Sequence, residues 1–211
     1  MGIRLTPAYI NRLCFEKKFK TYLIRQSMAG PKEKDNYHYI NYRGRQALRE
    51  KIGSFEPMTK QLILRSQMSE VITILLEKND PSDALFLSEN GTEINCLRHL
   101  NDDIFKQTIP VLINREDELP GDICNMIARQ TDDLDTLYLQ CKEKHKEVLP
   151  YILTVTRCSP DLFATILNMK TTEKEFELVH GTQDVLAQHL MSGKISIVRT
   201  PSLVKEEKNE L

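Results

Sequence analysis

Two pairs of cysteine and histidine have a spacing that metal sites and nucleophilic enzymes both use. Cys96 precedes His99 by three positions and Cys141 precedes His145 by four, so within a helix the side chains of each pair face the same side. Thiolate and imidazole groups are common ligands of tetrahedral Zn²⁺. A Cys/His nucleophilic pair needs a cleft and a third, orienting group, which the sequence does not identify. We expect Cys141 in the core and His145 bonded to backbone groups at a turn, with no metal or cofactor.

A further motif, Val-His-Gly-Thr at 179–182, resembles the opening motif of ADP-ribosyltransferases, in which the histidine holds a ribose. That fold needs several strands after the motif. Only 29 residues follow Thr182, and they contain one strand-like run, at 195–198. We therefore interpret His180 and Gly181 as a turn between helices. The chain has no glycine-rich phosphate loop and no HExxH motif. The sequence thus predicts no catalytic residue, although an enzyme on an unrecognised helical scaffold is one alternative.

The composition predicts a soluble globular protein. The chain has 211 residues, 40% of them hydrophobic and 28% charged, and a formal net charge of −1. Its apolar stretches are shorter than the about 18 residues of a membrane span, and residues 1–10 lack the apolar segment of a signal peptide. Five cysteines without a CxxC spacing indicate reduced thiols. We expect a cytoplasmic protein with no membrane span.

Charge is unevenly distributed along the chain. Residues 1–60 contain 13 Lys and Arg against 5 Asp and Glu, a balance of +8, which leaves −9 for the rest. A basic arm of this kind favours binding to nucleic acid or anionic lipid, which is an alternative function of residues 1–60. It also favours packing of the arm on its own acidic body, which we expect. Aromatic and arginine side chains alternate within 37–45. The candidate partner-binding residues are Tyr37, Tyr39, Tyr42, Arg43 and Arg45.

Apolar spacing predicts helices throughout. An amphipathic helix is expected over 6–24, and a second, basic helix over 42–52, with a domain boundary near residue 55. Beyond it, an acidic residue repeatedly precedes two apolar residues, with more apolar residues one turn later, as at a helix start. The six instances begin at Glu70, Asp103, Asp122, Glu147, Asp161 and Asp184.

The segment 136–153 resembles the two-helix part of an ankyrin repeat, whose pattern is roughly TPLHxAAxxGHxEVVxxLL. Thr136 stands at the proline of that pattern, Tyr138 at its first histidine, Cys141 at a small core position and His145 at the histidine after the turn between helices. Two more segments are similar to parts of the same repeat. Residues 69–80 resemble a second helix with its exit loop, and 180–193 resemble a turn, a second helix and a terminal glycine.

The spacing of these segments indicates degenerate repeats. The interval from Glu70 to Asp103 equals the period of an ankyrin repeat, whereas the interval from Asp103 to Glu147 is longer by a third, so extra helices near Asp122 and Asp161 must be accommodated. The resemblance implies an all-α solenoid in which each repeat buries its apolar stripe against its neighbours. A generic helical bundle is the alternative. The expected buried residues are Val71, Leu75, Val148, Ile152, Val185 and Leu186.

We expect three parts of the chain: a basic, partly helical region at 1–55, an ankyrin-like helical repeat domain at 56–195, and a polar, disordered tail at 196–211. The tail contains the block Glu-Glu-Lys-Asn-Glu, which resembles the EExxE block near the C-termini of effectors secreted by the type IV systems of intracellular bacteria. The candidate secretion-signal residues are Glu206, Glu207 and Glu210.

The predicted function is non-catalytic binding of another protein. Ankyrin-like repeats recognise partners through a non-covalent repeat surface, and the resemblance of the tail implies delivery into a host cell, where the partner is a host protein. Nucleic-acid binding is not expected. The sequence names neither the partner nor the oligomeric state.

Overall fold

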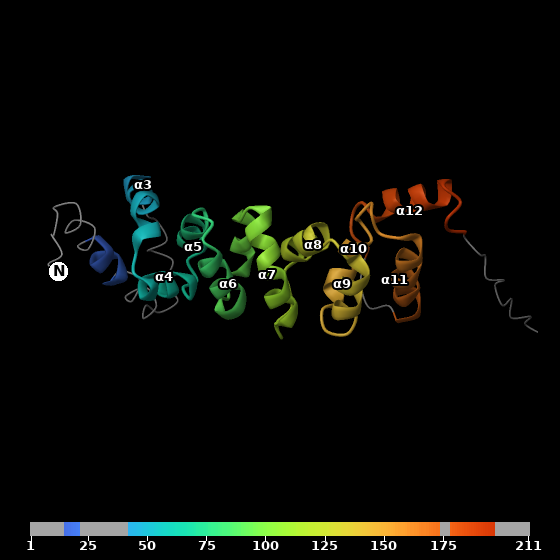
Figure 1. Cartoon of the computed structure of the whole chain (residues 1–211), viewed down its shortest axis with the longest axis horizontal. Helices are drawn as coiled ribbons and strands as arrows, with labels where there is room; N and C mark the ends of the chain where they lie inside the picture. Colours follow the sequence, from blue (N-terminus) through green and yellow to red (C-terminus); the bar gives the residue numbers. More distant parts are fainter. Residues whose placement is uncertain (1–14, 22–41, 174–177, 197–211) are drawn as a thin grey trace, which may run out of the picture.

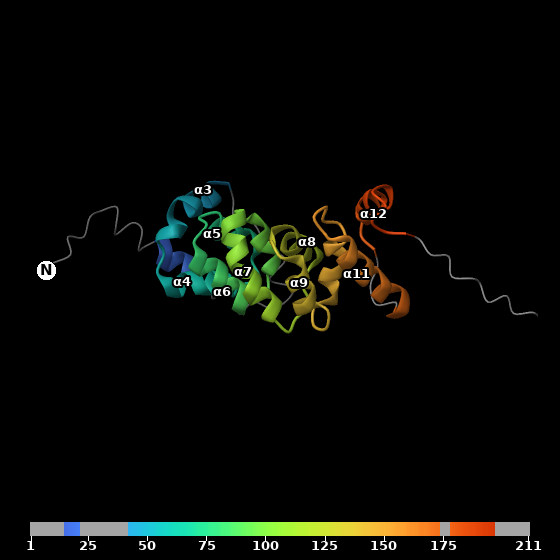
Figure 2. The ribbon, with the colours of Figure 1, turned by 45° about the vertical axis from the view of Figure 1, so that its right-hand side comes forward.

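The chain folds into helices that follow one another in a row. The computed structural model describes residues 15–21, 42–173 and 178–196. Within those residues the regular elements are α-helices and 3-10 helices, and no strand is present. The helices succeed one another in chain order along the long axis, from α3 (Tyr42–Lys51) to α11 (Pro160–Glu173) and α12 (Thr182–Met191) (Figures 1 and 2). The all-α prediction is confirmed for this part of the chain.

The predicted early helices are described in part. The one expected over 6–24 is described only as a short helix at 15–21, and the one expected over 42–52 is α3. The elements between α3 and α11 are η1 (Ile52–Ser54), α4 (Pro57–Leu64), α5 (Ser69–Leu76), α6 (Pro81–Asn90), η2 (Ile94–His99), α7 (Asp102–Asn114), α8 (Gly121–Gln130), α9 (Leu134–Cys141), η3 (Lys146–Val148) and α10 (Leu149–Ile152).

Local sequence signals explain where several helices begin. Asp80, Asn101 and Asp133 each precede a helix and accept a hydrogen bond from a backbone N–H of its first turn, at 3.0, 2.9 and 3.0 Å. Pro81 and Pro160 stand at the first position of α6 and α11, where the missing N–H of proline leaves no hydrogen bond unmade. These starts depend on residues within one turn of the helix, so they are readable from the sequence.

Three helices have equivalent buried positions at a regular interval. The buried residues are Ala84 and Leu87 in α6, Cys124 and Ile127 in α8, and Phe163 and Ile166 in α11. Successive members are 40 and then 39 positions apart. Each interval contains more than two helical segments, first α6, η2 and α7 and then α8, α9, η3 and α10. The structural interval is therefore longer than the ankyrin period that the sequence indicated.

One hydrophobic core runs through the described helices. It includes Val71, Leu75, Val148 and Ile152, all without measurable exposure, and Val185 at 2%, as predicted. Leu186 is only partly buried and packs against the core, so its predicted full burial is wrong. α12 buries Thr182, Val185 and His189, and Leu186 stands at the edge of the same stripe, on the side away from Val185.

The core is continuous across residue 55. Leu48 and Ile52 are buried in the same cluster as residues of α4 and α5. The helix at 15–21 packs at this end of the row, where the ring of Phe19 lies 5.9 Å from that of Phe55. The carboxylate of Glu16 accepts a hydrogen bond from the backbone N–H of Glu56 at 2.8 Å, just before α4 begins. This helix therefore packs against the segment that leads into α4.

Among the described residues, none of the helices combines the length and the apolar character that crossing a membrane requires.

Candidate functional site

The predicted partner-binding residues are only partly described. Tyr37 and Tyr39 lie outside the described residues. Tyr42 and Arg43 stand in the first turn of α3. Arg45, one turn further on, places its Nη1 3.0 Å from Oε1 of Glu70 in α5.

A second ion pair joins α3 to the residue after α5. Arg49 of α3 places Nε and Nη2 each 3.2 Å from a carboxylate oxygen of Glu77, which follows α5. Both members of this pair are well exposed, so the pair contributes at most about 1 kcal/mol. These contacts agree with the expectation that basic residues of the N-terminal region neutralise the acidic body nearby.

The cysteines that could have been ligands or nucleophiles are buried and protonated. Burial raises the pKa of the Cys141 thiol to about 12, and the negative charge of Glu147 adds to the shift. Cys96 is buried whereas His99, at the end of η2, is exposed. A thiol that stays protonated at neutral pH is a poor nucleophile. Among the described residues, no group of three or more His, Cys, Asp and Glu could hold a metal ion.

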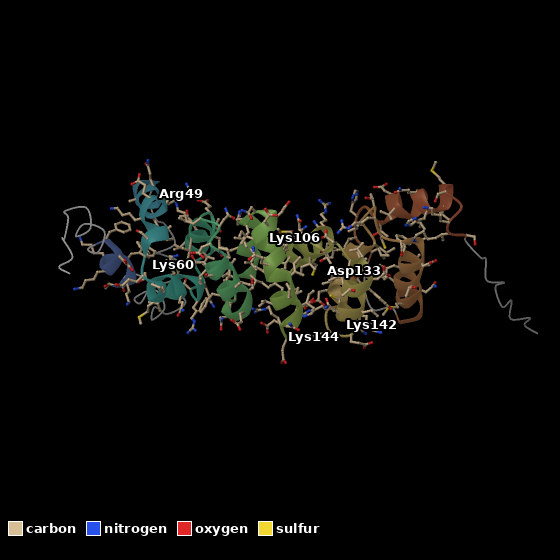
Figure 3. All side chains as sticks on the ribbon, in the orientation of Figure 1. Arg49, Lys60, Lys106, Asp133, Lys142 and Lys144 are labelled. Carbon is tan, nitrogen blue, oxygen red and sulfur yellow. The ribbon has the colours of Figure 1, made fainter. Side chains whose placement is uncertain are left out.

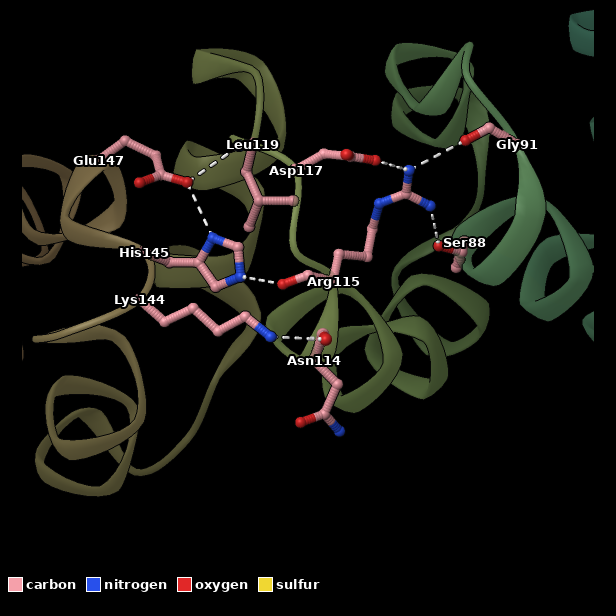
Figure 4. Close-up of polar contacts among 9 residues, drawn as sticks. All are labelled: Ser88, Gly91, Asn114, Arg115, Asp117, Leu119, Lys144, His145 and Glu147. Atoms are coloured by element: carbon pink, nitrogen blue, oxygen red, sulfur yellow. Dashed lines mark hydrogen bonds and ion pairs between the residues drawn. The ribbon is translucent and has the colours of Figure 1, made fainter.

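His145 is a buried link between segments (Figure 4). Its Nε2 lies 3.0 Å from the carbonyl oxygen of Arg115, and its Nδ1 lies 2.9 Å from Oε1 of Glu147. A carbonyl oxygen only accepts, so Nε2 carries a hydrogen. The same Glu147 oxygen accepts from the N–H of Leu119 at 2.9 Å. His145 therefore satisfies a backbone group, as expected, and ties the α7–α8 connection to η3.

Basic side chains cap helices that precede them along the chain. Arg115 donates to the carbonyl oxygens of Ser88 and Gly91 at the end of α6, at 2.6 and 3.1 Å. Lys144 donates to the carbonyl of Asn114, the last residue of α7, at 2.8 Å (Figure 4). The orphan carbonyls and the negative dipole end of a helix both favour such a cation.

Arg157 repeats at the end of α8 the arrangement that Arg115 makes at the end of α6. Its guanidinium donates to the carbonyls of Ala128 and Arg129 at 3.0 and 2.9 Å and also to that of Thr131, at the end of α8. Ala128 stands 40 positions after Ser88, and Thr131 stands 40 after Gly91. The capping contacts therefore follow the same interval as the buried positions. Nothing in the sequence analysis identified them.

A pocket of about 280 Å³ lies between α4 and α6. Its lining includes the apolar side chains Phe55, Leu64 and Phe86 and the charged side chains Lys60, Asp80 and Asp83. Lys60 extends from α4, near the N-terminal end of the row (Figure 3). Its Nζ lies 3.2 Å from Oδ2 of Asp80 and 3.2 Å from Oδ2 of Asp83.

The two carboxylates of the pocket have different electrostatic environments. Burial opposes ionisation of Asp80, but the N–H of Ser82 and the ammonium of Lys60 outweigh it and lower the pKa of Asp80. For Asp83 burial is the stronger effect, and its pKa is raised despite Lys60. Burial also opposes the charge of Lys60, yet the two carboxylates, Asp83 first, raise its pKa. Lys60 is therefore a firmly charged ammonium beside one readily ionised and one poorly solvated carboxylate.

The sequence signal for this pocket was incomplete. The ankyrin resemblance places Asp80 at the end of an exit loop, whereas Asp80 precedes the first residue of α6. No local pattern connects Asp80 and Asp83 with Lys60, which stands two helices earlier. The pocket combines a cavity with charged and aromatic lining, and we take it as the candidate site. In comparisons with known proteins, no family model, no curated protein and no solved structure matches this chain.

Proposed function

We propose that this chain is a protein-binding module without catalytic activity, built from degenerate ankyrin-like helical repeats. The observation that supports this most is the row of helices in chain order around one continuous core. In such an arrangement each unit packs mainly on its neighbours, so the outer residues of successive helices form one long surface. A long surface built this way suits recognition of another protein, because a partner is contacted by several units at once.

Two exposed apolar side chains support the proposal. Met58 of α4 is 63% exposed and Leu139 of α9 is 61% exposed. Methionine adapts its shape to different partners, and apolar side chains become anchors when an interface buries them. Met58 adjoins Pro57, which lines the pocket between α4 and α6. The α4 end of the row therefore combines an apolar side chain with charged groups, which is the usual composition of an interface.

The test starts from the full chain immobilised as bait in a eukaryotic lysate. A captured protein is then purified, and its affinity for the chain is measured by isothermal titration calorimetry. We expect binding that weakens about tenfold or more in Met58→Glu or Leu139→Glu, as for loss of an interface anchor. Met191 is 90% exposed at the other end of the row, so Met191→Glu shows whether any exposed apolar position gives the same loss.

Two results would contradict the proposal. One is turnover of a substrate by the purified chain, which would favour the enzyme. The other is tight, salt-sensitive binding to RNA or anionic vesicles that reversal of Arg43 and Arg45 abolishes, because phosphate contacts weaken steeply with salt.

We further propose that the module acts as a translocated effector on a host protein. This depends on the resemblance of the tail and of the repeats, and the tail residues Glu206, Glu207 and Glu210 lie outside the described residues. The test is a reporter fusion in a bacterium with a type IV system. Delivery into host cells should occur with the native tail and fall when the three glutamates are replaced by alanine. Absence of delivery with the native tail would contradict this proposal and leave the binding module untouched.

A further inference from the structure

The charges of the pocket between α4 and α6 do not balance. Two carboxylates, Asp80 and Asp83, face one ammonium, Lys60, which lies 3.2 Å from an oxygen of each. The side chain of Lys60 is 14% exposed and that of Asp83 is 10% exposed, so water screens the group only partly. One negative charge is left over in a poorly solvated place, where it favours a second cation.

Asp83 has room for a further donor. Its buried Oδ2 lies 3.2 Å from Nζ of Lys60, so this oxygen already has a cation of the same chain beside it. An ionised carboxylate has room for about four donors, so the other oxygen, Oδ1, is the one to which a further N–H group would donate. Burial is the largest cause of the raised pKa of Asp83.

The size and walls of the pocket indicate what kind of cation fits. A volume of about 280 Å³ is at the lower end of ligand pockets, which suits one side chain better than a whole cofactor. The aromatic wall is already suited to a guanidinium, since that of Arg65 lies 5.4 Å from the ring centre of Phe86. A long basic side chain has an apolar stem for such walls and a charged end for the carboxylates.

We propose that this pocket receives a lysine or arginine side chain of the protein partner, whose cationic end donates to Asp83 and completes the charge balance with Lys60 and Asp80. The inference rests on the proposed binding function and names the chemistry that the partner presents. A divalent cation fits less well, because Lys60 already occupies the position between the two carboxylates.

The probes are four pentapeptides, acetyl-Gly-Ser-X-Ser-Gly-amide, with arginine, lysine, norleucine or glutamate at X. Binding to the full chain is followed by two-dimensional amide NMR. With arginine or lysine we expect concentration-dependent shifts confined to 60–64 and 80–86. The norleucine peptide has the stem without the charge and should give none. Mg²⁺ and Ca²⁺ are titrated separately.

Two variants connect the shifts to the carboxylates. Asp83→Asn removes the buried charge and should weaken the arginine peptide about tenfold, as expected for loss of a charge-assisted contact. Asp122→Asn is the matched control, because Asp122 stands in the first turn of α8 and pairs with Arg98 on the surface at 3.0 Å. Lys60→Gln removes the ammonium of the chain itself, so both carboxylates are available to the peptide. This variant should bind the arginine peptide at least about threefold more tightly than the native chain. It keeps the test informative if Asp83→Asn folds poorly.

Equal shifts with the norleucine or glutamate peptide would overturn the inference. So would binding that survives Asp83→Asn, or saturation by a divalent cation that Asp83→Asn abolishes. The captured partner distinguishes this failure from failure of the module. If the partner binds Asp83→Asn as well as the native chain, the pocket is not its anchor and the binding function stands. If the peptides bind but no purified protein does, the pocket's preference for a basic side chain stands and the protein-binding function fails.

Discussion

Arg115 offers the sharpest test of the contacts between successive units. Its side chain is 11% exposed and donates to the carbonyl oxygens of Ser88 and Gly91, both of which belong to buried residues. Arg115→Met keeps the apolar stem and leaves two carbonyls at the end of α6 without donors. Hydrogen bonds from a charged donor are worth about 1.5 kcal/mol or more each, so we expect a loss of about 3 kcal/mol.

That loss is large enough to measure by urea unfolding, followed by far-UV circular dichroism. For a chain of this size it corresponds to a fall in Tm of about 6–12 °C. The backbone carbonyl of Arg115 still accepts from His145 in this variant, so the change is confined to the side chain. That side chain also loses its 2.7 Å ion pair with Asp117, whose side chain is 75% exposed, so this pair adds little to the loss. Arg98→Met is the control, because Arg98 is 53% exposed and pairs only with surface Asp122 among the described ion pairs.

The reasoning would be refuted by a loss of less than about 0.5 kcal/mol in Arg115→Met, the range of ordinary surface changes. It would also be refuted by an equal loss in Arg98→Met. Arg115→Lys should fall between the native chain and Arg115→Met, because an ammonium has the charge without the forked geometry that reaches two carbonyls.

Three more predictions concern the core, the thiols and the pocket. Leu75→Ala should cost about 2–5 kcal/mol in urea unfolding, because Leu75 is fully buried; a cost below about 1 kcal/mol would contradict its place in the core. A thiol reagent at pH 8 should modify Cys124, Cys141 and Cys158 of the native protein about a thousandfold more slowly than free cysteine, because a pKa of about 12 leaves almost no thiolate. The modified positions are identified by mass spectrometry of peptides, and fast reaction of these three before unfolding would contradict their burial. The pKa of Asp83 is raised above 3.8 in the folded state, so its contribution to the free energy of unfolding should rise as pH falls through that pKa toward 3.8. Urea unfolding at several pH values should show this rise in the native chain and not in Asp83→Asn. The same pH profile in both proteins would contradict the raised pKa.

The helices themselves were predictable from the sequence. Their starts depend on groups within one turn, such as the carboxylates of Asp80 and Asp133 and the ring of Pro160, and their buried faces follow the apolar spacing. For the same reason the burial of Val71 and Cys141 could be predicted, because each lies on the apolar side of its own helix. Leu186 shows the limit of this reasoning, since an apolar residue beside the buried stripe is only partly covered.

The longer interval between equivalent helices could not be recognised from the sequence alone. Equivalent positions hold different apolar residues, namely Ala84, Cys124 and Phe163. Each side chain has to fit the volume that its own neighbours leave, and those neighbours differ from one helix to the next. The resemblance to ankyrin repeats depended on two-helix segments, so the sequence indicated the shorter ankyrin period. The additional helix in each interval changed the spacing.

The capping arginines and the charged pocket were decided only by the tertiary structure. Arg115 and Arg157 are ordinary loop arginines in the sequence, and each reaches carbonyls 24 to 29 residues earlier because the helices pack in a row that brings those ends beside it. Lys60 meets Asp83 for the same reason, through the contact of α4 with α6. Helix starts depend on the nearest residues along the chain, whereas pairing of charges depends on distance in space, which only packing sets.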